Sequence, residues 1–308
     1  MLFQWPMAAA ISILLLASTG VIMLGTPCST VTKCSKVMID LLNQVSTALY
    51  WVFVWGAGLA VLGFMIGPII LALVMSFNAG ATLSFPPKGF SLQWYERLFD
   101  PVASEPIHTA ALNSIEVGLS TVALVTLITA PAAWALARAP KRFSGSVEPV
   151  LLAPLVLPSL VYALAALVAL NLLGLGPSFI AVLIGHTAVF APLMFRTVLG
   201  LAQRQNPALE EASETLGASR MRTFLRISLP GILPGILAGG FLVFMQSLDN
   251  VSVTLVLGDP GRTMLPMRLF AMLEESLDGR VAAVSGVLIL AAALLLVVLQ
   301  RFGAKDTH

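Results

Sequence analysis

The chain has 308 residues, of which 58% are hydrophobic and only 10% are charged, and its formal net charge is +2. Soluble domains are about half apolar and about a quarter charged, so this composition excludes an ordinary soluble protein and indicates one whose solvent is the lipid bilayer. The small net charge, without a basic run that contains aromatic residues, excludes a nucleic-acid-binding protein.

Residues 1–48 form an N-terminal extension. The apolar run 7–25 is expected to be an additional helix that starts outside, with an interfacial segment or a misassigned start codon as alternatives. No Lys or Arg precedes this run and no A-x-A site separates it from Cys28, which argues against a secretory signal peptide. Cys28 and Cys34 have no His or Cys companions, so we expect plain thiols and no metal site.

Six apolar runs follow the extension and predict membrane-spanning helices. A helix needs roughly 20 mostly apolar residues to cross a hydrocarbon core about 30 Å thick. Runs of this kind lie near residues 49–75, 109–137, 149–173, 178–199, 233–257 and 280–300. They are continuous and rich in Leu, Ala and Val, which favours an all-α membrane protein over a β-barrel with its short alternating strands.

The basic residues divide unevenly between the two sides of these helices. One side holds Lys33, Lys36, Arg138, Lys141, Arg142, Arg196, Arg204, Arg220, Arg222, Arg226, Arg301 and Lys305, and the other holds Lys88, Arg97, Arg262, Arg268 and Arg280. Because cytoplasmic segments carry the excess of Lys and Arg, the first side is predicted to be the cytoplasm. The tail 302–308 then lies inside, and segments 77–108 and 258–279 lie outside. We expect a multi-pass protein of a bacterial inner membrane.

The stretch EEASETLGASRMRTFLRISLP, from Glu210 to Pro230, places three Glu and three Arg between two long apolar runs. Asn206 is positioned to cap a short helix over residues 207–216, and Gly217 is positioned to end it. One face of this helix is predicted to hold Leu209, Ala212, Ser213 and Leu216, and the other side Glu210, Glu211 and Glu214.

A second short helix is predicted after Gly217. Ser219 is positioned to cap it, and its apolar and basic stripes suit the inner membrane interface. Pro230 and Pro234 are expected to break the chain before the next spanning helix. A solvated loop, whose charges only keep it out of the membrane, is the alternative. Two capped amphipathic helices around a Gly favour a docking elbow.

This stretch resembles the cytoplasmic signature of ABC importer permeases, which reads E-A-A, three residues, Gly, nine residues and I-x-L-P. The matching positions are Glu211, Ala212, Ser213, Gly217, Ile227, Leu229 and Pro230, with Ser213 in place of the second Ala. The resemblance implies that these residues, together with Glu210, couple the chain to an ATP-hydrolysing subunit. The chain has no G-x-x-x-x-G-K-[ST] phosphate loop, so ATP and Mg are expected on partner subunits and no cofactor is expected here.

A narrower resemblance covers roughly residues 60–300. The stretches LSFPPKGFSLQWYERLF, LNSIEVGLSTV and SLDNVSVTLVLGDPGRTMLPMRLFAMLEESLDGRVAAVS are similar to the second permease subunit of spermidine/putrescine-type importers. The resemblance implies a six-helix type I ABC importer domain over residues 49–301, with an elbow at 206–230 and an additional N-terminal helix. It also implies a second homologous permease, two ATP-binding subunits and a periplasmic or extracellular solute-binding protein as partners.

Acidic residues in the spanning helices are candidates for the substrate path. Asp249 is expected inside the helix 233–257, where an ionised carboxylate costs on the order of 2.5 to 3.5 kcal/mol. The resemblance implies a role for it on the translocation path, with Asn250 beside it; a helix cap or a contact with the partner permease is the alternative. Glu116 is expected about two turns into the second helix, either buried or wet near the outer interface.

The substrate is less well defined by the sequence. Asp249 and Glu116 favour a cation such as a polyamine, whereas Arg262 and Arg268 leave open a zwitterion or an organic anion such as a phosphonate or opine, or an amino-acid derivative. The outer-loop acids Asp259, Glu274, Glu275 and Asp278 could meet a cationic substrate or a docking protein, or simply be solvated. The lone His186 is expected to be a hydrogen-bonded core residue.

Three other classes of protein fit less well. A secondary transporter would show two inverted repeats, and none is visible in the sequence. An intramembrane enzyme would need a nucleophile with a base or a metal-ligand cluster, and neither H-E-x-x-H nor G-x-S-x-G is present, so we expect no catalytic residues. An ABC exporter would lack the elbow signature and would often carry its own phosphate loop.

Overall fold

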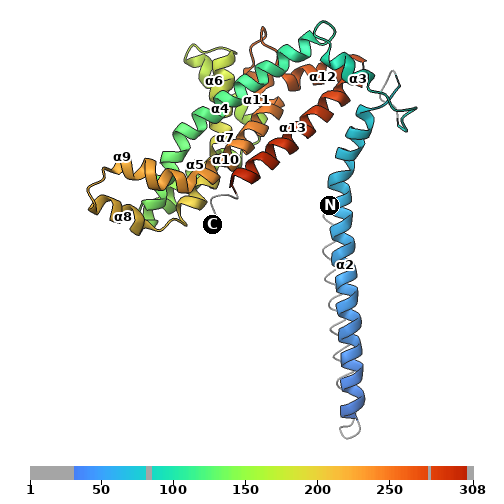
Figure 1. Cartoon of the computed structure of the whole chain (residues 1–308), viewed down its shortest axis with the longest axis vertical. Coiled ribbons are helices and arrows are strands. Elements are labelled where there is room, and N and C mark those ends of the chain that lie inside the picture. Colours follow the sequence, from blue (N-terminus) through green and yellow to red (C-terminus); the bar gives the residue numbers. More distant parts are fainter. Residues whose placement is uncertain (1–30, 81–84, 277–278, 304–308) are drawn as a thin grey trace. The chain divides into compact units, whose positions relative to one another are not determined.

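The computed structural model describes residues 31–80, 85–276 and 279–303, and these residues are almost entirely helical (Figure 1). An isolated bridge between Asn78 and Phe90 is the one extended pairing among them. The predicted helix over residues 7–25, Cys28 and Asp278 lie outside the described residues. The chain divides into two compact units, Met1–Ile69 and Ile70–His308, which are described separately below.

The first unit contains most of helix α2 (Val31–Ser76). The predicted first span began near residue 49, but the helix begins eighteen residues earlier, at Val31, and has 46 residues. This length is about twice the roughly 20 residues that a bilayer requires. The apolar part, Leu49–Ser76, is the span.

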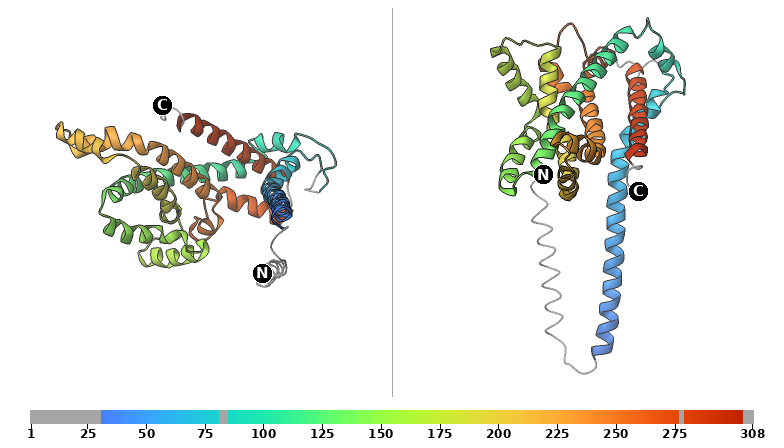
Figure 2. Two further views of the ribbon diagram at one scale, coloured as in Figure 1. Left: turned by 90° about the horizontal axis from the view of Figure 1, so that it is seen from below. Right: turned by 60° about the vertical axis from the view of Figure 1, so that its left-hand side comes forward.

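The second unit contains the remaining helices. They are α3 (Gln93–Phe99), α4 (Glu105–Arg138), α5 (Lys141–Leu152), η1 (Ala153–Leu155), α6 (Ser159–Leu172), α7 (Phe179–Ala202), α8 (Pro207–Thr215), α9 (Arg220–Thr223), η2 (Phe224–Ser228), α10 (Leu229–Asp249), α11 (Val251–Leu257), α12 (Leu265–Ser276) and α13 (Gly279–Gly303). Helices α4, α7 and α10 pack side by side in the centre of this unit, as both further views show (Figure 2).

Five helical stretches in the described part of the chain are long and apolar enough to span a membrane. They are Leu49–Ser76, Glu105–Arg138, Phe179–Ala202, Arg220–Asp249 and Gly279–Leu299. The predicted span 149–173 is instead a bent pair, Lys141–Leu155 and Ser159–Leu172, whose axes differ by 97°. Pro158 explains the bend, because a proline disfavours helical backbone at the residue before it and here caps α6 with an extended conformation.

Small residues allow α10 to approach α7 closely. A Cβ atom added at Gly239 would lie 2.9 Å from the Cα of Met194, so only glycine fits there. Thr197 donates a hydrogen bond from Oγ1 to the carbonyl of Gly235, 3.0 Å away. Close backbone approach and interhelical hydrogen bonds replace the hydrophobic effect as the source of helix association in lipid. The central bundle therefore holds α10 firmly against α7.

The helical path from the second elbow helix into α10 is continuous, so the expected break at Pro230 and Pro234 was wrong. Residues Arg220–Asp249 form one long helical stretch. It contains the π-helical turn η2, which closes with a hydrogen bond from Leu229 N to the carbonyl of Phe224. Pro230 follows this turn in the first turn of α10, where a missing N–H is tolerated. The second elbow helix is therefore the inner extension of a spanning helix.

The same path ends earlier than expected at its other end. The predicted span 233–257 stops at Asp249, because Asn250 leaves the helical conformation (φ −76°, ψ 103°) and begins α11. His186 of α7 is fully buried beside this break. Its Nδ1 lies 2.8 Å from Ser247 Oγ in α10, and its Nε2 lies 3.4 Å from Thr254 Oγ1 in α11. His186 is thus a hydrogen-bonded core residue, as predicted, and it contacts both sides of the break.

Candidate functional site

The elbow segment, residues 206–230, has the local structure that the sequence predicts. Asn206 accepts a hydrogen bond at Oδ1 from Ala208 N and caps α8, and Ser219 accepts one at Oγ from Arg222 N and caps α9. Both caps satisfy backbone donors that a helix start would otherwise leave without partners. The two helices and their caps are confirmed.

Gly217 ends α8 in the left-handed region, with φ +85°. Two backbone hydrogen bonds close the turn around it, from Gly217 N to the carbonyl of Glu214 and from Ala218 N to the carbonyl of Ser213. This pair of bonds is the Schellman arrangement that terminates many helices, and it requires a positive φ at the glycine. Gly217 therefore sets the angle between α8 and α9.

The carboxylate of Glu210 points inward and fastens α8 to the spanning helices. Oε1 accepts hydrogen bonds from Trp134 Nε1 (3.0 Å), Arg138 Nη2 (2.8 Å) and Ser228 Oγ (2.8 Å), and Oε2 accepts one from Arg138 Nε (3.0 Å). Its side chain is only 13% exposed. The expectation that Glu210 shares an outer face with Glu211 was therefore wrong, because partly buried donors on α4 and a buried donor on η2 bind Glu210.

Arg138 extends this attachment to α7. Its third nitrogen, Nη1, donates a hydrogen bond to the carbonyl of Ala202, 2.8 Å away, at the end of α7. The Glu210–Arg138 pair therefore joins α8, α4, α7 and η2 at one point. We call Trp134, Arg138, Glu210 and Ser228 the anchor cluster.

The anchor cluster keeps Glu210 ionised. Hydrogen bonding from Arg138 is the main reason why the pKa of Glu210 is lowered from 4.5 to about 2. A lowered pKa stabilises the folded chain above the usual value, and this stabilisation is lost as the pH falls from about 4.5 towards 2. The attachment of α8 is therefore at full strength at neutral pH.

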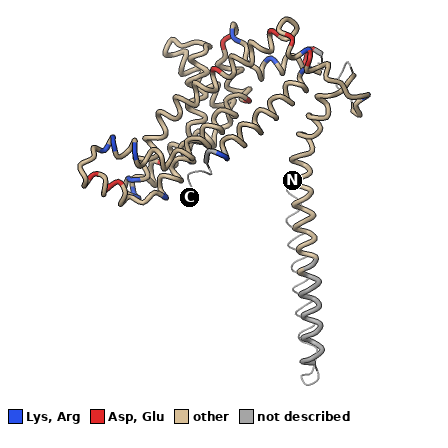
Figure 3. The backbone as a smooth tube through the Cα atoms, in the orientation of Figure 1, with Lys and Arg blue, Asp and Glu red and all other residues tan. Residues whose placement is uncertain are grey.

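The elbow segment also exposes apolar side chains. Leu209 on α8, Leu216 at the C-terminal cap of α8 and Met221 on α9 are all more than half exposed, and Leu216 reaches 89%. Ser213 instead turns inward, where its Oγ lies 3.1 Å from Thr223 Oγ1. Exposed apolar side chains that are surrounded by charged residues are typical of a protein-binding surface. Figure 3 shows charges gathered at this end of the unit and at the opposite end, with few between.

The candidate path residues lie at that opposite end. Asp249 is the last residue of α10 and is exposed, so the expectation that it lies within an apolar helix was wrong. The reason is the break at Asn250, whose Oδ1 accepts a hydrogen bond from Val253 N and caps α11. The structure thus assigns a capping role to Asn250, and leaves the carboxylate of Asp249 free to face solvent or a partner.

Glu116 forms an ion pair that the sequence did not predict. Its Oε2 lies 2.8 Å from Nη2 of Arg262, in the loop between α11 and α12. Glu116 is 51% exposed, in agreement with the wet alternative, and it lies three turns into α4 because that helix begins at Glu105. No local signal could have found this pair, since the two residues are 146 positions apart.

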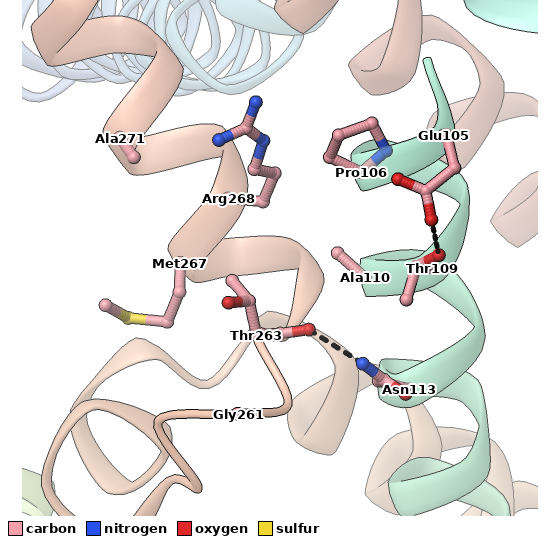
Figure 4. Close-up of a pocket in the computed structure, with 10 residues that line it drawn as sticks. All are labelled: Glu105, Pro106, Thr109, Ala110, Asn113, Gly261, Thr263, Met267, Arg268 and Ala271. Atoms are coloured by element: carbon pink, nitrogen blue, oxygen red, sulfur yellow. Dashed lines mark hydrogen bonds between the residues drawn. The ribbon is translucent and has the colours of Figure 1, made fainter. Parts of the chain in front are cut away.

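A cavity of about 370 Å³ lies between α4 and α12 at the same end (Figure 4). Glu105 and Arg268 lie on opposite sides of it. Asn113 donates a hydrogen bond across its floor to the carbonyl of Thr263, 3.0 Å away. Among the described residues, no group of three His, Cys, Asp or Glu side chains is placed to hold a metal ion.

Comparison with known proteins agrees with this geometry. Residues 117–304 match the family described as binding-protein-dependent transport system inner membrane component. The chain is 29% identical over 242 residues to the spermidine/putrescine transport system permease protein PotC of Haemophilus influenzae, with 78% of this chain and 92% of that protein covered. It is also 29% identical over 215 residues to the molybdenum transport system permease protein ModB of Mycobacterium tuberculosis, with 65% and 81% covered.

A solved structure has the same fold. It is the crystal structure of a bacterial alginate ABC transporter in complex with an alginate pentasaccharide-bound periplasmic protein, and the TM-score is 0.59. The match covers 91% of this chain and 99% of that one at 17% sequence identity. At this level of identity, the likeness shows the fold.

Proposed function

Since the chain belongs to the family of binding-protein-dependent transport system inner membrane components, it is a membrane-spanning importer permease, and we propose that its substrate is a polyamine such as spermidine or putrescine. The observation that carries the proposal is the likeness to PotC, which extends over 92% of that protein. The exposed carboxylates of Glu116 and Asp249 at one end of the bundle support it, because they would attract a cation.

A second candidate is an anionic or zwitterionic solute, such as a phosphonate, an opine or an amino-acid derivative. The percentage identity to ModB, a molybdenum transport system permease, equals the identity to PotC, and this supports an anionic solute as a second candidate. Arg268 in the cavity of Figure 4 would attract an anion. The likeness to ModB covers less of the chain than the likeness to PotC. We therefore rank the polyamine first.

The proposed partners are a second homologous permease, two ATP-binding subunits that hold ATP and Mg, and an outer solute-binding protein. The likeness to an alginate transporter in complex with a periplasmic protein supports the last of these. The exposed apolar side chains of the elbow segment, Leu209 and Leu216, would bind an ATP-binding subunit. The charge asymmetry of the loops supports a position of this end of the chain at the cytoplasmic face of a bacterial inner membrane.

The elbow segment would transmit the work of ATP hydrolysis to the bundle. The anchor cluster ties α8 to α4, α7 and η2, so movement of α8 would move the inner ends of these helices together. The helical stretch Arg220–Asp249 has 30 residues and is about 45 Å long. Because it has no break at Pro230, displacement of its inner end would reach Asp249 at its outer end.

The proposed substrate is tested by reconstituting the chain with its partner subunits and its solute-binding protein in proteoliposomes. We expect saturable uptake of radiolabelled spermidine or putrescine that requires ATP and the binding protein. Molybdate and an alkyl phosphonate serve as comparisons and are expected not to accumulate. Uptake of either anion without uptake of a polyamine would contradict the substrate and leave the permease role intact.

A further inference from the structure

We propose that Glu116 and Phe179 form a binding site for an ammonium group of the substrate, and that Arg262 of the same chain occupies this site when substrate is absent. The proposal rests on the polyamine substrate proposed above. It assigns to Arg262 the role of a displaceable internal cation at the outer end of the bundle.

The three residues come from three separate elements and already form a cation site. The Nη2 atom of Arg262 lies 2.8 Å from Glu116 Oε2, and its Cζ atom lies 4.9 Å from the centroid of the Phe179 ring. Glu116 belongs to α4, Phe179 begins α7, and Arg262 lies in the loop before α12. A carboxylate beside an aromatic face is the combination that binds alkylammonium groups, through charge and through the ring quadrupole.

The exposure of this pair makes an exchange of cations inexpensive. Glu116 and Arg262 are 51% and 41% exposed, and ion pairs this open to solvent contribute little to stability. The anchor-cluster pair differs, because Arg138 and Glu210 are 19% and 13% exposed and Arg138 binds both carboxylate oxygens. The Arg138–Glu210 pair is therefore suited to remain closed, and the Arg262–Glu116 pair is suited to open.

The loop that carries Arg262 does not need the ion pair to stay in place. Thr263 accepts a hydrogen bond from Asn113, and Leu265 N donates one to Ser114 Oγ at 2.8 Å. The backbone of Arg262 is held in a turn by a hydrogen bond to the carbonyl of Asp259. The guanidinium can therefore leave Glu116 while the backbone around it remains fixed to α4.

A second carboxylate lies at a similar depth. Helices α4 and α10 run antiparallel, and Gly118 packs against the ring of Phe244. From this contact, Glu116 lies two residues and Asp249 five residues towards the outer end, so their depths differ by only about 5 Å at 1.5 Å per residue. Two carboxylates at similar depth suit a molecule that carries more than one ammonium group.

The test uses Arg262→Cys in the assembled transporter, after Cys28 and Cys34 are replaced with Ser. A cationic methanethiosulfonate reagent labels the introduced thiol, and the rate is followed by the mass of the chain. We expect saturating spermidine to slow labelling about fivefold or more, since occupied sites do not react. Spermidine should give no protection when Glu116→Gln is added, and 1,4-butanediol should give none in either background. Glu96→Gln, a distant outer acid on α3, is the matched control and should keep the protection.

Three results would overturn the proposal. They are failure of the introduced thiol to label, labelling that spermidine does not slow, and protection that persists in Glu116→Gln. Uptake by the unaltered transporter separates this failure from that of the substrate assignment. Spermidine uptake without protection contradicts the ammonium site alone, whereas absence of spermidine uptake contradicts the proposed substrate.

Discussion

Replacing Glu210 with Ala is expected to leave ATP hydrolysis running while uptake of substrate falls by more than about tenfold. The substitution removes the acceptor for Trp134, Arg138 and Ser228 together and leaves Arg138 without its carboxylate. Losing one member of a buried pair costs about 3 to 5 kcal/mol, and the partial exposure of this pair reduces the figure to about 2 kcal/mol. A loss of this size shifts the ratio of attached to detached α8 by about thirtyfold. ATP turnover and uptake, measured on the same proteoliposomes, give the coupling ratio.

Glu214→Ala is the matched control for this substitution. Glu214 lies on the same helix, and its contact with Arg220 is long, at 3.8 Å, with the side chains of Arg220 and Glu214 88% and 46% exposed. Removing such a pair changes stability by only a few tenths of a kcal/mol, so uptake should stay near that of the unaltered protein. If Glu210→Ala retained coupled uptake within about twofold of the unaltered protein, the anchor cluster would have no part in transmission.

Replacing Gly217 with Val is expected to lower coupled uptake about tenfold. The φ of +85° costs an ordinary residue about 1 to 2 kcal/mol and suits a β-branched residue least of all. No atom lies within 4 Å of an added Cβ, so the effect must come from the backbone rather than from a clash. The turn between α8 and α9 should open, and Leu216 should move from the position in which we propose that it contacts an ATP-binding subunit. The measurement is again the ratio of uptake to ATP hydrolysis.

Two substitutions separate this effect from a general disturbance. Gly200→Ala, in α7, likewise adds a Cβ atom where no atom lies within 4 Å, but Gly200 has no positive φ, so transport should be unchanged. The ratio of uptake to ATP hydrolysis in Gly217→Asn should lie between the ratios of the unaltered chain and of Gly217→Val, because Asn tolerates the left-handed region. Equal transport by Gly217→Val and the unaltered chain would show that the angle at residue 217 is not needed.

Local signals in the sequence predicted the elbow segment well. Asn206, Gly217 and Ser219 each act within three residues of their own position, and the structure shows the caps and the turn that their residue types require. The apolar runs likewise predicted the spanning helices, since a bilayer imposes length and composition on each helix separately. The resemblance to ABC importer permeases predicted the fold, which the likeness to the alginate transporter shows.

Features that depend on distant residues could not be predicted in the same way. The inward turn of Glu210 is decided by Trp134 and Arg138, which lie more than 70 positions earlier in the chain. A helical wheel assigns a face by polarity alone, and it takes no account of an arginine on the buried side. The ion pair between Glu116 and Arg262 was missed for the same reason.

The sequence predicted that some helices are broken, but it did not always predict the residue at which the break occurs. Pro158 gives a bend, whereas Pro230 does not, because the π turn before it leaves Pro230 in the first turn of α10, where a missing N–H is tolerated. The break at Asn250 carried no proline or glycine, and the sequence offered a helix cap here only as an alternative, at Asp249 rather than at Asn250. Its cause is a side-chain cap, which competes with the helix at that residue.

Photo-crosslinking from Leu216 tests the central claim, that the elbow segment is where an ATP-binding subunit engages this permease. Benzoylphenylalanine is placed at Leu216, the most exposed apolar side chain of the elbow segment, and in a second sample at Val102, which is equally exposed at the other end of the unit. In the assembled transporter, position 216 should give an adduct with the ATP-binding subunit, and position 102 should give none. An assembled, ATP-hydrolysing complex in which position 216 forms no such adduct would contradict the account.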